Sequence, residues 1–169
     1  MAHTVGLGLG SNVGDRLANI RKARELLRAL SPDGVVYYQA PLYQSEPVDC
    51  APDSPDFYNT IIEIDFVGDP HQLLRNTQGI EYHLGRDMVR EPNAPRVIDI
   101  DILYFDQLVL TGDILTIPHP QIAHRRFVLQ PLSDIRPHFI LPGDVVTVEE
   151  HLRRLDTGEP DLSLVQSDW

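Results

Sequence analysis

The sequence predicts an α+β fold: a ferredoxin-like antiparallel sheet with packed helices, forming a single-domain α/β/α sandwich. Three observations lead to this prediction. The hydrophobic pattern orders the main elements as strand, helix, strand, strand, helix, strand, and the middle two strands can pair as a hairpin. The chain has 169 residues, about the size of one domain. Its hydrophobic fraction of 42% is ordinary for a globular protein.

The first five elements follow from residue periodicity. Residues 4–10 are rich in Val, Leu and Gly, which suits a buried strand that another backbone approaches closely. Apolar residues recur at helical spacing over residues 15–30 and predict an amphipathic helix. Strands are expected over residues 35–43 and 57–66. The helix over residues 69–85 begins with Asp-Pro and ends with Gly, as capping rules favour.

The later elements are shorter. Residues 97–105 alternate isoleucine with aspartate and predict a strand, which a turn connects to a short hairpin partner over residues 108–110. Short helices are expected over residues 130–135 and 148–155. Residues 157–169 are expected to form a flexible tail. The domain therefore covers residues 1–169, with its core over about 4–156.

Composition limits the partners and the compartment. The formal net charge of −11 disfavours nucleic acid and anionic membranes as partners, so an anionic ligand needs a local basic cluster. The single cysteine, Cys50, excludes an intramolecular disulfide. No stretch reaches the roughly 18 apolar residues of a membrane span. The start of the chain lacks a signal-peptide pattern, so we expect a cytoplasmic protein.

Asp99 and Asp101 are the most informative pair of residues. On a strand they share one face, about 7 Å apart, so that their carboxylates can converge on a hard cation such as Mg²⁺. An isolated Asp-x-Asp is more often a solvated strand face. Several cations lie near this pair in the sequence, which favours a phosphate site, although surface ion pairs would also explain them. These cations are Arg86, Arg90, Arg96, His119, His124, Arg125 and Arg126.

Two further patterns are less specific. Phe57 and Asn59 share the strand face opposite the expected core stripe of residues 58, 60, 62, 64 and 66. An aromatic ring beside an amide suits a flat, hydrogen-bonding heterocycle, but a cross-strand packing pair is an equally good interpretation. Gly8-x-Gly10 is a weak match to a dinucleotide motif, because Gly14 comes one residue too late.

Longer motifs resemble a known family. The chain resembles the 6-hydroxymethyl-7,8-dihydropterin pyrophosphokinases of folate biosynthesis from about Gly6 to Pro137, and its Pro-Arg-x-Ile-Asp-Ile-Asp-Ile-Leu stretch is highly specific. The motifs, in order, are Gly10-Ser11-Asn12, Tyr43-Gln44-Ser45-Glu46-Pro47-Val48, Asp56-Phe57-Tyr58-Asn59, Gly85-Arg86, Pro95-Arg96-Val97-Ile98-Asp99-Ile100-Asp101-Ile102-Leu103, Pro118-His119-Pro120 and Arg125-Arg126-Phe127-Val128-Leu129.

The resemblance implies transfer of pyrophosphate from ATP to the pterin hydroxymethyl group, with release of AMP and with two Mg²⁺ ions held by Asp99 and Asp101. By position, Arg86 and Arg96 match the catalytic arginines, beside the same two aspartates. The implied pterin-binding residues are Ser45, Pro47, Val48, Phe57, Asn59 and Phe127. The implied ATP-binding residues are Leu74, Gln78, Glu81, Arg86, Arg96, Ile102, Leu115, Thr116, His119 and Arg125.

Some positions depart from the family, and other functions stay open. Met88, Asn93 and Pro120 stand where family members often carry a basic residue, Trp and Tyr, which affects loop closure and the hold on the triphosphate. The alternatives are a catalytically silent nucleotide- or metal-binding module and another Mg²⁺-dependent phosphoryl or nucleotidyl transferase. We expect a monomer that binds small molecules; association with other folate-pathway enzymes is left open.

Overall fold

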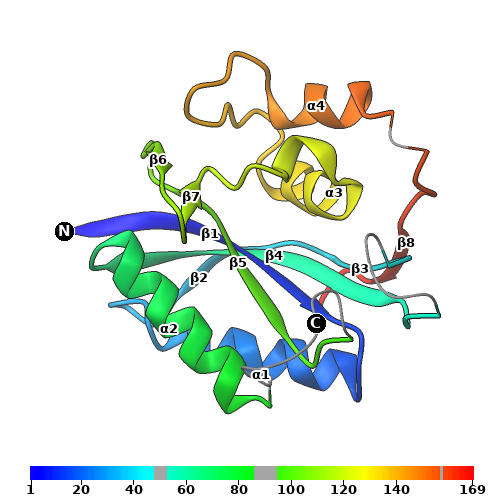
Figure 1. Ribbon diagram of the computed structural model, residues 1–169, viewed down its shortest axis with the longest axis horizontal. Helices are drawn as coiled ribbons and strands as arrows, with labels where there is room; N and C mark the ends of the chain where they lie inside the picture. Colours follow the sequence, from blue (N-terminus) through cyan, green and yellow to red (C-terminus); the bar gives the residue numbers. More distant parts are fainter. Residues whose placement is uncertain (48–52, 86–94, 157) are drawn as a thin grey trace.

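The computed structural model describes residues 1–47, 53–85, 95–156 and 158–169. One antiparallel sheet has the strand order β5-β1-β4-β3-β8, and β2 also pairs with β4. Helices α1 and α2 cover one face of the sheet, and α3 and α4 cover the other, which confirms the predicted sandwich (Figure 1). Among the described residues, none of the helices is long and apolar enough to span a membrane.

The strands of this sheet are β1 (Ala2–Ser11), β2 (Val36–Gln39), β3 (Leu42–Ser45), β4 (Phe57–Val67), β5 (Asp99–Phe105) and β8 (Ser163–Gln166). The helices are α1 (Arg16–Arg28), α2 (Pro70–His83), α3 (Arg126–Ile135) and α4 (Val148–Arg154), with a 3₁₀ turn at Ile122–His124. Two further strands, β6 (Leu110–Thr111) and β7 (Thr116–Ile117), pair with each other. The expected pairing of residues 108–110 with the preceding strand is therefore wrong.

An aspartate caps the start of both α1 and α2, and the sequence predicted the cap of α2. The Asp15 carboxylate accepts a hydrogen bond from the main-chain N–H of Ala18 at 3.1 Å. At α2 the capping is reciprocal: Asp69 accepts from the main chain of Gln72, whose side chain accepts from the main chain of Asp69. Such caps satisfy N–H groups that have no partner inside the helix.

The sheet separates two hydrophobic cores. Ile62, Ile64 and Phe66 of β4 pack toward α1 and α2, as the alternation predicted. The opposite face of the same strand is also buried, because Ile61 belongs to a second cluster that contains residues of α3 and α4. Glu63 on that face is only 2% exposed. The prediction of a core on one side of this strand was therefore incomplete.

A bulge in β5 changes which side chains share a face. Leu7 pairs with Ile102 but the neighbouring Gly6 pairs with Tyr104, so Leu103 is an extra residue in the ladder. Tyr104 consequently lies in the α3/α4 cluster rather than with Ile102, contrary to the simple alternation. The two aspartates precede the bulge and keep their common face.

Glu63 of β4 links the C-terminal end of α3 to the sheet through hydrogen bonds. Its carboxylate accepts hydrogen bonds from the Tyr104 hydroxyl at 2.6 Å and from the Arg136 guanidinium at 3.0 and 2.5 Å. Arg136 is the C-terminal cap residue of α3. Burial, followed by the charge and hydrogen bond of Glu63, raises the pKa of Tyr104, so its hydroxyl remains a donor. A buried carboxylate without these donors would be strongly destabilising.

The expected flexible tail is wrong for its last residues. Ser163–Gln166 form β8, which pairs with β3. Trp169 is 7% exposed and belongs to the α1/α2 core. Its indole N–H donates to the Ala40 carbonyl at 2.8 Å, and its own carbonyl accepts from Gln39 at 2.9 Å and from Arg24. Burial of one large aromatic ring outweighs the acidic character of the segment.

We expect Trp169→Ala to lower the free energy of unfolding by about 3–5 kcal/mol, because it empties a buried aromatic site and leaves the Ala40 carbonyl without its donor. Urea unfolding followed by circular dichroism measures the change. The control is Leu164→Ala in the same segment, since Leu164 is 58% exposed. A loss below about 1 kcal/mol for Trp169→Ala would show that this ring does not anchor the segment.

Candidate active site

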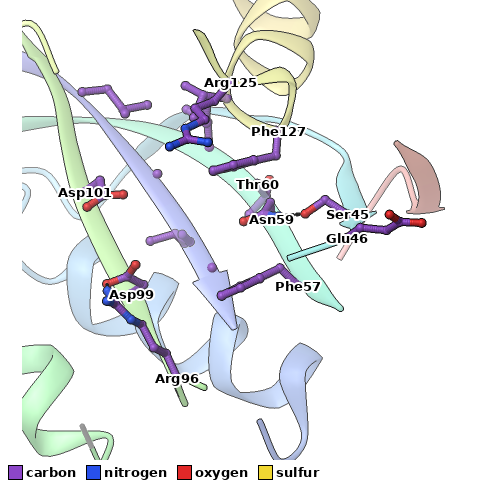
Figure 2. A pocket seen from close by; sticks show the side chains of 16 residues that line it. Ser45, Glu46, Phe57, Asn59, Thr60, Arg96, Asp99, Asp101, Arg125 and Phe127 are labelled. Carbon is purple, nitrogen blue, oxygen red and sulfur yellow. Dashed lines mark hydrogen bonds and ion pairs between the residues drawn. The ribbon is translucent and has the colours of Figure 1, made fainter. Parts of the chain in front are cut away.

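A pocket of about 290 Å³ opens on the α3/α4 side of the sheet. Its walls come from β1, β4, β5, the end of β3 and the start of α3 (Figure 2). The functional side chains gathered there include the two carboxylates of β5, two guanidinium groups, two phenyl rings and a primary amide. These are Asp99, Asp101, Arg96, Arg125, Phe57, Phe127 and Asn59.

Glycines of β1 form the floor of the pocket. Gly8 lies opposite Asp101 on one side and Ile61 on the other, and Gly10 lies opposite Asp99 and Asn59. A Cβ atom at Gly10 would come within 3.0 Å of the Asn59 amide oxygen. The absence of side chains at these positions therefore keeps space open between the carboxylates and the amide.

The two aspartates project into this space from alternate positions of β5, as the sequence predicted (Figure 2). Arg96 precedes the strand, and its guanidinium donates to the Asp99 carboxylate at 2.9 Å. The main chain of Arg96 is fixed as well, since its N–H donates to the Asn12 side chain at 2.5 Å and its carbonyl accepts from the Asn12 N–H at 2.9 Å.

The donor set fits Mg²⁺. No group of three or more His, Cys, Asp or Glu that could hold a metal occurs among the described residues. Mg²⁺ often takes only one or two protein carboxylates and completes its octahedron with water and phosphate oxygens. Asp99 and Asp101 supply two such carboxylates on one face. The site therefore suits a cation that arrives with a phosphate ligand better than a permanently held structural metal.

The opposite end of the pocket is aromatic. Phe57 from β4 and Phe127 from α3 line it, and Figure 2 shows the Asn59 amide between their rings. Asn59 is 7% exposed, and its amide nitrogen donates to the Ser45 hydroxyl at 2.5 Å. This hydrogen bond fixes which way the amide faces. The pair of residues is thus part of a pocket wall, which distinguishes it from simple cross-strand packing.

His119 lies outside the pocket lining but within the electrostatic reach of Asp99 and Arg125. Burial lowers the pKa of His119; the Asp99 charge opposes this effect and the Arg125 charge adds to it. Its Nδ1 accepts the main-chain N–H of Gln121 at 3.1 Å. The neutral ring therefore carries its proton on Nε2, where it can donate to an anionic ligand.

The predicted nucleotide residues are spread along α2, β5 and β7. The side chains of Ile102 and Leu115 lie in the α1/α2 core, and Leu74 packs against it. Gln78 is exposed on α2, and Thr116 belongs to β7. None of these residues lines the pocket described above, and neither does Glu81. Their nucleotide contacts stay predictions.

Three further predicted site positions are Pro47, Val48 and Arg86. Val48 and Arg86 lie outside the described residues. Pro47 is described but does not line the pocket. Residues that the sequence did not assign to the site include Gly8, Gly10, Glu46, Thr60, Leu103 and Val128. The signal that could have indicated the glycines is their period of two, at 6, 8 and 10, on a strand.

Comparisons with known proteins concern the family of the chain. Residues 6–137 match the family model for 7,8-dihydro-6-hydroxymethylpterin-pyrophosphokinase (HPPK). The 2-amino-4-hydroxy-6-hydroxymethyldihydropteridine pyrophosphokinase of Methylorubrum extorquens is 40% identical over 151 residues, which cover 89% of this chain and 92% of that protein.

Longer proteins contain a similar segment. The folic acid synthesis protein FOL1 of Dictyostelium discoideum is 37% identical over 91% of this chain but only 23% of its own length. The solved structure of Plasmodium falciparum HPPK-DHPS wild type with pteroate has a TM-score of 0.71 at 17% identity, covering 91% of this chain and 42% of that chain. This chain spans less than half of each of these two proteins, and the second likeness concerns the fold.

The match over residues 6–137 and the 40% identity to a relative of similar length lead to one conclusion: the chain belongs to the 7,8-dihydro-6-hydroxymethylpterin-pyrophosphokinase family.

Proposed function

We propose that this chain transfers a pyrophosphoryl group from Mg²⁺-bound ATP to the hydroxymethyl group of 6-hydroxymethyl-7,8-dihydropterin and releases AMP. The observation that carries the proposal is one pocket with a carboxylate pair at one end and an aromatic-amide wall at the other. A transferase for these substrates needs a hydroxyl of a flat heterocycle to face a polyphosphate. The two ends of the pocket supply these two environments.

The pterin ring fits the aromatic end. Phe57 and Phe127 offer apolar faces for stacking, and the Asn59 amide oxygen can accept a hydrogen bond from a ring N–H. Because Ser45 holds the amide nitrogen of Asn59, the amide is oriented before the substrate binds. A pre-oriented amide loses little conformational entropy on binding, so it favours this ligand over rings without a matching donor.

The triphosphate fits the charged end. Asp99 and Asp101 would hold two Mg²⁺ ions, which supply positive charge to the triphosphate oxygens when bound. Arg96 and Arg125 line the same end and can donate planar hydrogen bonds to phosphate oxygens. The pterin hydroxyl then attacks the β-phosphorus in line and gives up its proton to solvent, while the bond between the β-phosphorus and the α-phosphate oxygen breaks and AMP leaves. The residues act by position and charge, and no protein nucleophile is required.

Three general properties of the enzyme belong to the same proposal: its oligomeric state, its domain extent and its location. We propose that the chain acts as a monomer on small-molecule substrates. We propose one domain over residues 1–169 and a cytoplasmic location. Arg86 keeps its expected role as a second catalytic arginine, and Pro47 and Val48 keep theirs beside the pterin.

The direct test is turnover with 6-hydroxymethyl-7,8-dihydropterin, ATP and Mg²⁺, with the nucleotide product identified by chromatography. We expect AMP only when the pterin is present, and loss of at least about 100-fold in rate for Asp101→Asn or on removal of Mg²⁺ by chelation. Asp156→Asn is the control, since Asp156 is exposed and outside the pocket. Formation of ADP instead of AMP would overturn the proposal.

Arg96→Ala is expected to lower kcat by about 100-fold or more, because the guanidinium faces charge that develops on the phosphates, while the dissociation constant for the pterin changes less than about threefold. Steady-state kinetics and calorimetric titration with pterin separate the two effects. Arg153→Ala, at an arginine that pairs with Glu149 and Glu150 on α4, serves as the control. Equal loss in both quantities for Arg96→Ala would contradict a role at the phosphates.

Gly8→Ala tests the floor of the pocket. A Cβ there would meet Leu103 at 3.7 Å, an ordinary contact, so the fold should tolerate it. The added methyl group stands among the pocket-lining residues, and we expect KM for at least one substrate to rise about tenfold with Tm nearly unchanged. Gly79→Ala in α2, where nothing lies within 4 Å, is the control and should retain activity. Wild-type kinetics for Gly8→Ala would show that the substrates do not approach this floor.

A further inference from the structure

We infer that Glu81 is a positioning residue for the reaction: its buried carboxylate holds the part of β5 that carries Asp99 and Asp101. The inference rests on the proposed function, because it gives Glu81 a part in the same site. It also differs from the expectation from the family resemblance, in which Glu81 contacts ATP. The role assigned here is carried by a contact to the main chain of the protein.

Glu81 contacts the main chain of β5 between the two aspartates. Glu81 lies near the end of α2 and is only 4% exposed. Its Oε2 accepts a hydrogen bond from the main-chain N–H of Ile100 at 2.9 Å. Ile100 stands between the two aspartates and is itself 6% exposed, with its side chain in the α1/α2 core. The carboxylate therefore contacts the strand midway between the proposed metal ligands.

The position of β5 in the sheet explains why this contact matters. β5 is an edge strand that pairs with β1 on one side. Since the Ile100 N–H donates to α2, it points away from β1, toward the edge where no strand among the described residues supplies an acceptor. A buried N–H without an acceptor is destabilising, because it loses its hydrogen bond to water on folding. Glu81 thus supplies the hydrogen-bond acceptor for the Ile100 N–H that a neighbouring strand would supply elsewhere in the sheet.

The link to chemistry follows from strand geometry. Asp99 and Asp101 flank Ile100, so a shift of its main chain moves both carboxylates together. Their convergence on shared cations depends on this placement, and a displacement of about 1 Å near reacting groups can cost about 100-fold in rate. A carboxylate is a stronger acceptor than a neutral amide, which suits a residue whose task is to fix one N–H group.

The test compares Glu81→Ala with Glu81→Gln, which retains an oxygen acceptor. Hydrogen exchange of the Ile100 amide is measured by NMR, alongside kcat, KM for both substrates and the Mg²⁺ concentration that gives half-maximal rate. Thr77→Val is the matched control, because Thr77 is 1% exposed on the same helix and its hydroxyl donates only locally, to the Leu74 carbonyl. This variant should behave as wild type in exchange and in kinetics.

For Glu81→Ala we expect Ile100 exchange to accelerate at least about tenfold, with kcat lower and the Mg²⁺ requirement higher by about tenfold each, and with KM for the pterin unchanged. Glu81→Gln should keep the amide protected and stay within about threefold of wild type in kcat. Unchanged exchange in Glu81→Ala overturns the inference. The inference is also overturned if Glu81→Gln keeps the Ile100 amide protected but loses as much activity as Glu81→Ala. The charge of Glu81 would then act on the ligand.

Failure of the proposed function would look different. If the wild-type protein forms no AMP, the assignment of the reaction falls, and with it the catalytic part of the inference. The exchange measurement on Glu81→Ala still decides whether the carboxylate fixes the strand, because it requires no substrate. The two outcomes are therefore separable in one set of proteins.

Discussion

The antiparallel pairing of β1 with β5 is the constraint on which the rest of the site depends. It sets Gly8 and Gly10 opposite Asp101 and Asp99, so that the two carboxylates stand beside two residues of β1 that carry no side chains. Because β1 also pairs with β4, the same glycines lie next to Ile61 and Asn59. A single register thus fixes the distance between the charged and the aromatic end of the pocket. A shift by one residue would turn the aspartates into the α1/α2 core.

The two faces of the sheet have different roles. On the α1/α2 face, Ile100 and Ile102 of β5 are buried in the hydrophobic core. The other face is shared between the pocket and a second apolar cluster, so a helix must approach the sheet without filling the site. Glu63 achieves this by holding Arg136 at the C-terminal end of α3. The opposite end of this helix then presents Phe127 to the pocket, beside Arg125.

Local signals in the sequence were sufficient for most elements and for the Asp99 and Asp101 pair, because periodicity and caps act over a few residues. They were insufficient where burial is decided by distant parts of the chain. The polar Asn59 and Glu63 resemble a solvated face, although helices late in the chain cover them. Leu103 gives no local sign of a bulge within an apolar run. The other nucleotide residues came from the resemblance alone, since they form no distinctive pattern: Leu74, Gln78, Glu81, Ile102, Leu115 and Thr116.

The pairing of β8 with β3 also has a consequence for synthesis on the ribosome. The edge of β3 stays open from the time that residue 45 emerges until residues 163–166 follow, and Trp169 comes later still. At about 5–20 residues per second, a nascent chain spends several seconds with this edge and the Trp169 site uncovered. Exposed edges of this kind invite pairing with other chains. Chaperones that bind extended apolar segments would therefore act on this protein mainly before residues 163–169 have left the ribosome.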